Sequence, residues 1–297
     1  MKKQNKGTLY IVGTPIGNLR DITIRALDTL KDVDVILAED TRQTLKLLNH
    51  YEISKKLISY HKFNETNRIN QIVEMLEEGK DLALVSDAGM PILSDPGQPL
   101  VMELIKQKIS IEVVPGPTAL TSAIVYSNIP TETFVFEGFL EVGSKKRKER
   151  LEKIKLEKRT MIFYEAPHKL KATLKDLEKV VGDRKVCLVR EITKIYEEKK
   201  YTTVKKLLEE VEEKGIKGEI VFILEGNNEI VNIVNASNKT NKEEVNDYIK
   251  QGFSKNDAIK KVARERGLSK NEVYMECINN DKWKKNRYRY VNVWEKS

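Results

Sequence analysis

The chain has 297 residues and a net charge of +8, and its 40% hydrophobic and 33% charged residues are typical of a globular protein large enough for two domains. No stretch approaches the roughly 20 apolar residues of a membrane-spanning helix, and the first residues lack the apolar core of a signal peptide, so we expect a soluble, cytoplasmic protein. Two widely separated cysteines and three histidines without metal-ligand spacing argue against a disulfide framework and a metal centre.

The first 129 residues alternate between strand and helix patterns. Strands are expected at 8–12, 33–38, 57–60, 81–85 and 111–114. Helices are expected at 22–30, 41–48, 65–78, 98–106 and 118–126. This alternation predicts an α/β domain, residues 1–129, with a largely parallel sheet covered by helices on both faces.

Four loops that follow these strands contain unusual residues. They are 13–18, 39–42, 86–97 and 115–119. The third has two glycines, two prolines and the carboxylates of Asp87 and Asp95, directly after a buried strand. Because ligands of open α/β sheets bind at the carboxyl ends of the strands, we expect a small-molecule site there. The loops contain no Walker A sequence, no dinucleotide-binding glycine pattern and no calcium-binding loop, which favours a ligand without phosphates that is held mostly by backbone groups.

Three further segments follow. Aromatic strand patterns at 134–136 and 161–164, with apolar runs at 185–189 and 219–224, predict a second α/β domain over residues 130–226. Residues 227–241 are interpreted as a linker. Residues 242–297 are expected to form a small helical, basic domain, in which Ser254 and Ser269 are N-caps and the apolar positions Ala258, Ile259, Val262 and Ala263 form one buried face. The break between its two short helices is similar to a helix-turn-helix unit.

The positive charge is concentrated in two segments. Residues 144–159 hold nine Lys/Arg against three Glu, and residues 239–297 hold 15 Lys/Arg against nine Asp/Glu. Such segments favour a polyanionic partner, although a solvated helix face and a charged tail explain them equally well. Near the end of the chain, Arg287 and Arg289 alternate with aromatic residues, which suits either RNA contact or a last strand packed by its tyrosines.

Several blocks occur in the order found in one protein family. They are Leu9–Leu19, Ala38–Arg42, Val85–Gly89, Ser94–Gly97, Pro115–Pro117, Glu137–Leu140 and Phe163–Glu165. Together they resemble the bacterial ribosomal RNA small subunit methyltransferase I family, within the tetrapyrrole methylase superfamily. The resemblance covers residues 7–226, and the helical segment to about residue 280 is similar to the usual C-terminal appendage of that family.

The resemblance implies a two-domain class III methyltransferase that binds S-adenosylmethionine between its domains and methylates the ribose 2′-oxygen of a cytidine in 16S rRNA. It implies a homodimer and a 30S particle as substrate. Methylation of a tetrapyrrole or small metabolite, or a non-catalytic RNA-binding role, are the alternatives. The fold alone does not separate them.

The resemblance also implies the site residues. The cofactor would be lined by Ser86, Asp87, Ala88, Gly89, Met90, Thr118 and Ala119, and the site closed by Pro15 and Glu165. Met90 stands where the family usually has a small hydroxyl residue. Residues 195–198 replace a segment that often contains Trp-Glu and are assigned no role.

The acceptor hydroxyl and the RNA phosphates require further side chains. Asp40 and Arg42 are the candidates for acting on the poorly acidic 2′-hydroxyl, followed by Glu165 and His61. A structural ion pair that caps the following helix is an equally good explanation of Asp40 and Arg42. Lys145, Lys146, Arg147 and Lys148, with Arg287 and Arg289, are expected to contact RNA phosphates.

Overall fold

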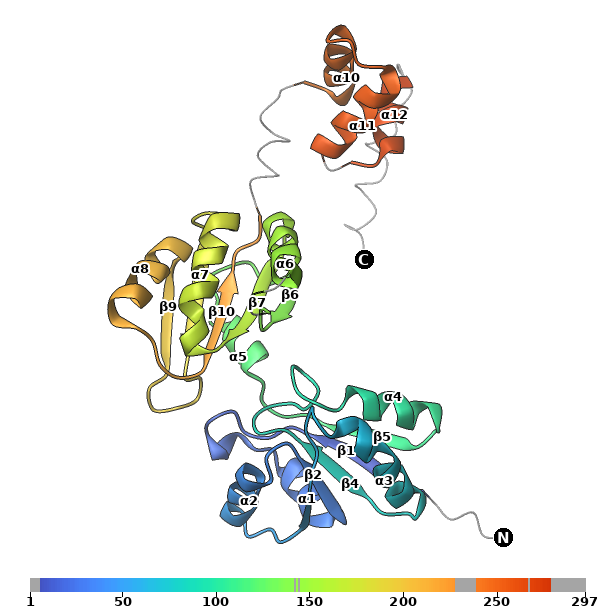
Figure 1. The fold of residues 1–297 in the computed structure, drawn as a ribbon, viewed down its shortest axis with the longest axis vertical. Coiled ribbons are helices and arrows are strands. Elements are labelled where there is room, and N and C mark those ends of the chain that lie inside the picture. The colour runs from blue at the N-terminus through green and yellow to red at the C-terminus, as the bar shows by residue number, and fades with distance from the viewer. Residues whose placement is uncertain (1–5, 142, 144, 228–238, 267, 279–297) are drawn as a thin grey trace, which may run out of the picture. The chain divides into compact units, whose positions relative to one another are not determined.

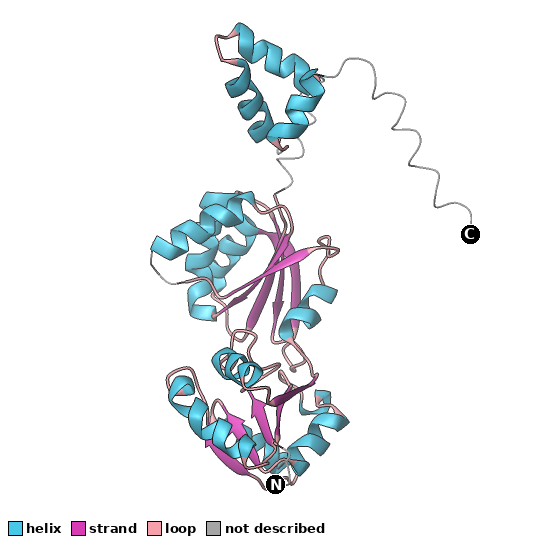
Figure 2. Ribbon diagram, turned by 90° about the vertical axis from the view of Figure 1, so that its right-hand side faces the viewer, coloured by secondary structure: helices cyan, strands magenta, loops and turns pink. Residues whose placement is uncertain are grey.

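The computed structural model describes residues 6–141, 143, 145–227, 239–266 and 268–278. The chain divides into two compact units, Met1–Gly226 and Asn227–Ser297, and each is considered by itself. The first unit contains two β-sheets and the second contains helices (Figures 1 and 2).

The first sheet has five parallel strands in the order β3-β2-β4-β1-β5. They are β1 (Thr8–Val12), β2 (Val35–Ala38), β3 (Lys56–Ser59), β4 (Leu82–Val85) and β5 (Ser110–Val114). Every residue of β2 and β4 is buried, as expected for central strands covered on both faces. The predicted parallel sheet is therefore confirmed.

Helices cover both faces of this sheet. They are the short 3-10 helix η1 (Leu19–Asp21) and the α-helices α1 (Ile24–Asp32), α2 (Thr41–His50), α3 (Glu65–Glu77) and α4 (Gln98–Lys106). One apolar cluster joins α3 and α4 to the sheet through Leu76 and Leu104, and a second joins α1 and α2 through Leu30 and Leu48. All five parallel strands therefore end at the same edge, where the four unusual loops begin.

The second sheet has the order β6-β7-β10-β8-β9, with β6 parallel to β7 and the other pairs antiparallel. Its strands are β6 (Phe134–Gly138), β7 (Thr160–Glu165), β8 (Lys185–Arg190), β9 (Glu198–Thr203) and β10 (Ile220–Leu224). One face is covered by α6 (Lys145–Leu156), α7 (Pro167–Val181) and α8 (Val204–Lys214), which bury a cluster around Phe163 and Phe222 (Figure 2). The sequence did not indicate β9, because this edge strand is only partly buried and lacks an apolar run.

Helix α5 (Ala119–Val125) packs on the second sheet. Its Ala123 is buried in a cluster with Ile162, Val221 and Ile223 of the second sheet. Helix α5 therefore packs with the second sheet although it precedes the expected domain boundary after residue 129.

The C-terminal unit is built from α10 (Asn241–Lys250), α11 (Lys255–Glu265) and α12 (Lys270–Ile278). Its predicted buried face is confirmed, because the four positions of α11 pack with Val245 and Val273. The hydroxyl oxygens of Ser254 and Ser269 accept hydrogen bonds from the N–H groups of Asp257 and Glu272, as N-caps do. The described helices number three, so the helix-turn-helix resemblance covers only α11 and α12.

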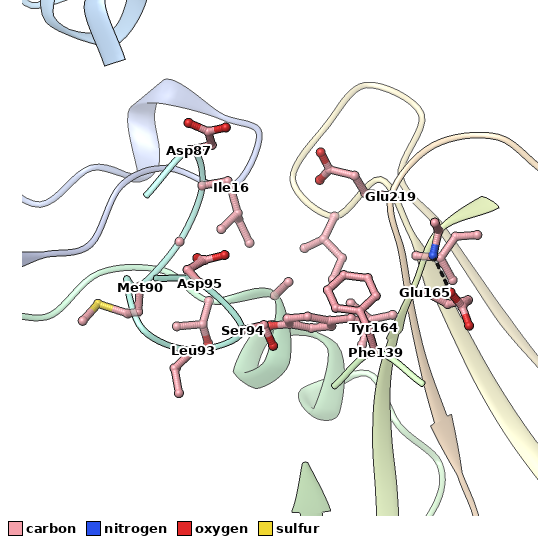
Figure 3. A pocket seen from close by; sticks show the side chains of 18 of the residues that line it. Ile16, Asp87, Met90, Leu93, Ser94, Asp95, Phe139, Tyr164, Glu165 and Glu219 are labelled. Atoms are coloured by element: carbon pink, nitrogen blue, oxygen red, sulfur yellow. Dashed lines mark hydrogen bonds between the residues drawn. The ribbon is translucent and has the colours of Figure 1, made fainter. Parts of the chain in front are cut away.

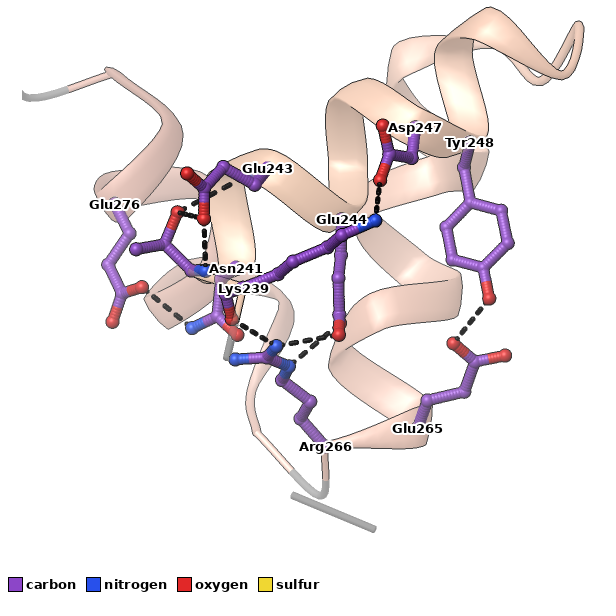
Figure 4. Close-up of polar contacts among 10 residues, drawn as sticks. Lys239, Asn241, Glu243, Glu244, Asp247, Tyr248, Glu265, Arg266 and Glu276 are labelled. Atoms are coloured by element: carbon purple, nitrogen blue, oxygen red, sulfur yellow. Dashed lines mark hydrogen bonds and ion pairs between the residues drawn. The ribbon is translucent and has the colours of Figure 1, made fainter. Parts of the chain in front are cut away.

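Polar contacts also join these three helices (Figure 4). The Arg266 guanidinium pairs with the Glu244 carboxylate at 2.7 Å, and the Asn241 amide donates to Glu276 at 2.6 Å. Most of the expected linker and the tail with Arg287 and Arg289 lie outside the described residues. Within the described part of the chain, none of the helices combines the length and apolarity needed to span a bilayer.

Candidate functional site

A cavity of about 470 Å³ lies where the loops of the first sheet face the second sheet (Figure 3). The loops that follow β1, β2 and β4 contribute Ile16, Glu39, Asp87, Ala88, Gly89, Met90, Leu93, Ser94 and Asp95. Thr118, the residue before α5, and Ala119, the first residue of α5, also line the cavity. The second sheet and its loops contribute Phe139, Tyr164, Glu165, Ala166, Pro167, Ile192, Glu219, Ile220 and Val221. This is the edge at which the topology of a parallel sheet places a ligand.

The loops that follow β1, β4 and β5 are joined by their backbones. The Thr14 N–H donates to the Gly89 carbonyl at 2.9 Å, and the Gly89 N–H donates to the Thr14 carbonyl at 3.1 Å. A Cβ atom on Gly13 would lie 2.7 Å from the Cα atom of Gly116, so both positions require glycine. These contacts hold the three loops together at the edge of the sheet where Gly89 lines the cavity.

The loop after β4 contains backbone strain next to the cavity. Ile92 and Ser94 both have φ of +76°, in the left-handed region that a β-branched residue such as Ile92 strongly disfavours. The Glu65 carboxylate accepts a hydrogen bond from the Gly97 N–H at 3.2 Å, which helps to hold the end of this loop. The strained turn presents Leu93, Ser94 and Asp95 to the cavity.

Five carboxylates line the cavity, and none of its lining residues is a lysine, an arginine or a histidine. Glu165 accepts hydrogen bonds from the Ala166 N–H at 2.9 Å and the Thr173 hydroxyl at 2.6 Å, and Glu219 pairs with Lys194 at 3.2 Å. The other three, Glu39, Asp87 and Asp95, are termed the acidic wall.

Burial and mutual repulsion disfavour ionisation of the acidic wall. Burial raises the pKa of Asp95 to about 6, and the Glu39 carboxylate adds to this effect. Burial also raises the pKa values of Glu39 and Asp87. Asp87 is oriented by the Asp40 N–H, which donates to its Oδ1 atom at 3.0 Å. A cationic ligand would relieve this repulsion.

The structure brings most of the expected cofactor-binding residues together on the cavity wall. These are Asp87, Ala88, Gly89, Met90, Thr118, Ala119 and Glu165. Pro15 and Ser86 do not line the cavity. Ser86 is only 3% exposed, and its hydroxyl donates to the Ala88 carbonyl at 3.3 Å, so it shapes the loop from behind.

The Asp40–Arg42 pair lies beside the cavity and does not line it. Asp40 is the N-cap of α2, and its carboxylate accepts from the Arg42 N–H at 2.9 Å and pairs with the guanidinium at 2.6 Å. Hydrogen bonds from Arg42 lower the pKa of Asp40 to about 2, which makes this carboxylate a weak proton acceptor. The geometry therefore favours the capping interpretation, and a catalytic role of Asp40 and Arg42 stays a prediction. His61 also lies outside the lining residues.

Sequence reasoning did not select several residues that line the cavity. Phe139 and Tyr164 stand inside two of the blocks that resemble the family, and Glu39 precedes Asp40, so their positions contained a usable signal. Asp95 was noted as a loop carboxylate but was not placed in the site. Glu219 offered no signal, since only tertiary packing brings the residue before β10 to this cavity.

The basic segment at 144–159 forms α6, and one of its four selected residues is buried. Arg147 is 9% exposed, and its guanidinium bonds the Asp176 carboxylate at 2.9 Å and the Glu141 carbonyl at 2.7 Å. The side chain therefore fastens α6 to α7, and this burial does not suit its predicted contact with RNA phosphates. Lys145, Lys146 and Lys148 are exposed.

No group of three or more His, Cys, Asp or Glu side chains arranged to hold a metal ion occurs among the residues that the structure describes. The acidic wall is not such a group.

Comparison with known proteins places the chain in a family. Residues 8–221 match the family model of the Tetrapyrrole (Corrin/Porphyrin) Methylases. The ribosomal RNA small subunit methyltransferase I of Halalkalibacterium halodurans is 46% identical over 92% of this chain and 95% of its own length. The protein of that name from Thermotoga maritima is 50% identical over 74% of this chain and 99% of its own length.

Solved structures agree on the fold. A uroporphyrin-III C-methyltransferase from Thermus thermophilus, solved as a complex with S-adenyl homocysteine, matches with a TM-score of 0.55 and 18% identity over 74% of this chain and 97% of that one. The cobalt precorrin-4 methyltransferase CbiF matches with a TM-score of 0.55 and 22% identity over 73% of this chain and 94% of that one. The chain belongs to the tetrapyrrole methylase family and, within it, to the family of ribosomal RNA small subunit methyltransferase I.

Proposed function

We propose that this protein transfers a methyl group from S-adenosylmethionine to the ribose 2′-oxygen of a cytidine in 16S rRNA. The names of its relatives support a small-subunit rRNA substrate. The observation on which the proposal mainly rests is the charge of the cavity, which is lined by five carboxylates and no basic side chain. Such a cavity suits a cofactor that is cationic and lacks phosphates, as S-adenosylmethionine is.

The chain would hold this cofactor chiefly through its rigid backbone. When bound, S-adenosylmethionine supplies an activated methyl group. The joined loops at Gly13, Gly89 and Gly116 would fix its position, and the acidic wall would face its positive charge. Apolar side chains such as Ile16, Leu93 and Ile192 line the same cavity and would exclude water. The enzyme's task is then to align a ribose oxygen with the methyl carbon.

The exposed lysines of α6 support an RNA substrate. Lys145, Lys146 and Lys148 lie at the start of α6, a few residues after the cavity residue Phe139. Phosphates would remain at these lysines while a single nucleotide enters the acidic cavity. A tetrapyrrole bearing several carboxylates would be repelled by the acidic wall, which weighs against that alternative.

The proposal includes a 30S particle as the substrate, a cytoplasmic location and a homodimer. Three exposed apolar side chains on α4 and the edge strand β5 support self-association, namely Met102, Ile105 and Val113, which are 55%, 64% and 54% exposed.

The test uses the purified full chain, radiolabelled S-adenosylmethionine and undermethylated 30S subunits, with free 16S rRNA and a carboxylated porphyrin as parallel acceptors. The expected result is label on one cytidine ribose of 16S rRNA, located by nucleotide mapping. Label on the porphyrin alone would contradict the proposal and indicate that the protein methylates a tetrapyrrole. Cofactor binding with no transfer to any acceptor would leave a non-catalytic RNA-binding role.

A further inference from the structure

Three aromatic rings form a small cluster at the cavity. The ring centroids of Phe136 and Tyr164 are 5.0 Å apart, and those of Phe139 and Tyr164 are 5.7 Å apart, both in edge-to-face geometry. Tyr164 and Phe139 line the cavity next to one another (Figure 3). Phe139 is the outer ring, and 52% of it is exposed.

The position of Phe139 is well determined by its neighbours. Gly138 before it has φ of +60°, a conformation that turns the chain at the end of β6, and Leu140 after it is only 4% exposed within the core of the second sheet. The Tyr164 hydroxyl accepts a hydrogen bond from the Leu120 N–H at 3.0 Å, which holds the supporting ring. The half-exposed Phe139 beside Tyr164 therefore offers a flat apolar surface at the cavity.

A nucleobase is a suitable occupant for this surface. Single-stranded RNA is commonly recognised by bases that stack on aromatic side chains, since every base has a π face. Enzymes that act on one nucleotide take it out of its stack into a pocket, where a ring replaces the lost neighbours. The cavity presents two such rings, Phe139 and Tyr164.

The connection from β6 to α6 favours the target nucleotide over the adenine of the cofactor. Phe139 precedes Lys145 by six residues, a separation that spans at most about 20 Å of extended chain. The stacking ring just after β6 and the exposed lysines at the start of α6 are therefore close enough to suit a base and the phosphates on either side of the same nucleotide. The backbone loops proposed to hold the cofactor come instead from the first sheet.

We infer that Phe139, supported by Tyr164, stacks on the base of the nucleotide whose ribose is methylated, so that it binds the substrate RNA and not the cofactor. This inference rests on the proposed function and names the RNA contact of that site. Stacking is insensitive to base identity, so the ring positions the nucleotide without selecting cytidine.

The test compares Phe139→Ala, Phe139→Leu and Phe139→Trp in the full chain. KM for undermethylated 30S subunits is measured by methyl transfer, and Kd for S-adenosylmethionine by calorimetry. Phe139→Ala is expected to raise the KM for 30S subunits about 5- to 150-fold and to leave the cofactor Kd within about twofold. Phe139→Leu keeps apolar volume but loses the π face, so its KM should rise as in Phe139→Ala. Phe139→Trp keeps a π face, so its KM should stay close to the wild-type value. Phe63→Ala is the matched control, since Phe63 is 93% exposed and does not line the cavity.

A photo-crosslinking phenylalanine analogue at position 139 gives a readout that is independent of turnover. A cross-link to the methylated nucleotide or its neighbour is expected. A cross-link to the cofactor, an unchanged KM in Phe139→Ala, or equal losses of RNA and cofactor affinity would overturn the inference. If the wild-type protein transfers no methyl group to RNA, the proposed function fails, and the cross-link still decides whether Phe139 contacts RNA.

Discussion

Gly13 and Gly116 pack backbone against backbone, although they are separated by most of the first α/β half of the chain. A Cβ atom on Gly116 would lie 2.9 Å from the Cα atom of Gly13, and a Cβ atom on Gly13 would lie 2.7 Å from the Cα atom of Gly116. This contact brings the loops after β1 and β5 together, next to Gly89, which lines the cavity.

Gly13→Ala is therefore expected to force these two loops apart. We expect a loss of about 1–3 kcal/mol in the free energy of unfolding, because two backbones cannot shift as a flexible side chain can. The loss is measured by urea denaturation, and cofactor affinity by calorimetry. Gly215→Ala is the control, since Gly215 has φ of +66° but nothing within 4 Å of the added atom, so it measures backbone strain alone. Unchanged cofactor affinity in Gly13→Ala would contradict the proposed position of the cofactor.

The acidic wall predicts selectivity for charge. Asp95→Asn should raise the Kd for S-adenosylmethionine about five- to tenfold, because one negative charge facing the sulfonium is lost. The Kd for S-adenosylhomocysteine, which lacks the sulfonium charge, should change much less. Calorimetric titration of both ligands tests this, with Asp28→Asn on the exposed surface of α1 as the control for net charge. A parallel loss for both ligands would show that Asp95 does not sense the sulfonium.

The raised pKa of Asp95 also predicts how stability depends on pH. Burial raises this pKa from 3.8 to about 6, so the folded state binds a proton more tightly than the unfolded state does. The ionised form therefore costs stability above pH 6, and this cost disappears as the pH falls below about 4. Asp95→Asn should stabilise the ligand-free protein by about 1–2 kcal/mol at pH 7.5, which is less than the full pKa shift implies because Asp95 is partly accessible to solvent. The same substitution should give no gain in stability near pH 3.5. Urea denaturation at the two pH values measures the difference, and an equal gain at both would exclude this titration.

Two substitutions at Asp40 separate capping from proton transfer. Asparagine is also a good N-cap, so Asp40→Asn should retain most turnover, whereas Asp40→Ala should cost about 1 kcal/mol of stability through loss of the cap. Turnover is measured by single-turnover methyl transfer and stability by thermal unfolding. A collapse of turnover in a stable Asp40→Asn protein would restore Asp40 as a catalytic residue.

The four basic residues at the start of α6 should divide into two kinds. Replacing Lys145, Lys146 and Lys148 by Gln should weaken the salt dependence of RNA binding. The slope of log K against log salt should become less negative by about two to three, and folding should be unaffected. Arg147→Gln should leave this slope unchanged and destabilise the protein by about 1.5–3 kcal/mol, since it removes charged hydrogen bonds from a buried guanidinium. Filter binding over a salt series and thermal unfolding provide the two readouts. A weaker salt dependence in Arg147→Gln would show that this side chain contacts RNA phosphates and does not serve mainly to join α6 to α7.

Most helices and strands, and the edge of the sheet at which the cavity lies, follow from local patterns in the sequence. Continuous apolar runs such as Leu82–Val85 define central strands, and the glycine and proline residues that follow them end these strands at one edge. Ser254 and Ser269 indicate where helices begin, because an N-cap hydrogen bond joins residues only three positions apart. These features are local, and local periodicity and capping chemistry are visible in a single sequence.

Contacts between distant side chains depend on long-range packing. The burial of Arg147 depends on Asp176, which is 29 residues away, and α5 joined the second sheet because its apolar face found Ile162 and Val221 there. Phe139 faces the cavity because Leu140 beside it is buried in the core. In the same way, Glu39 and Asp95 belong to different loops, and their repulsion arises only when the parallel strands bring both loops to one cavity. Long-range packing sets these distances, so neither the composition nor the spacing of the sequence contains them.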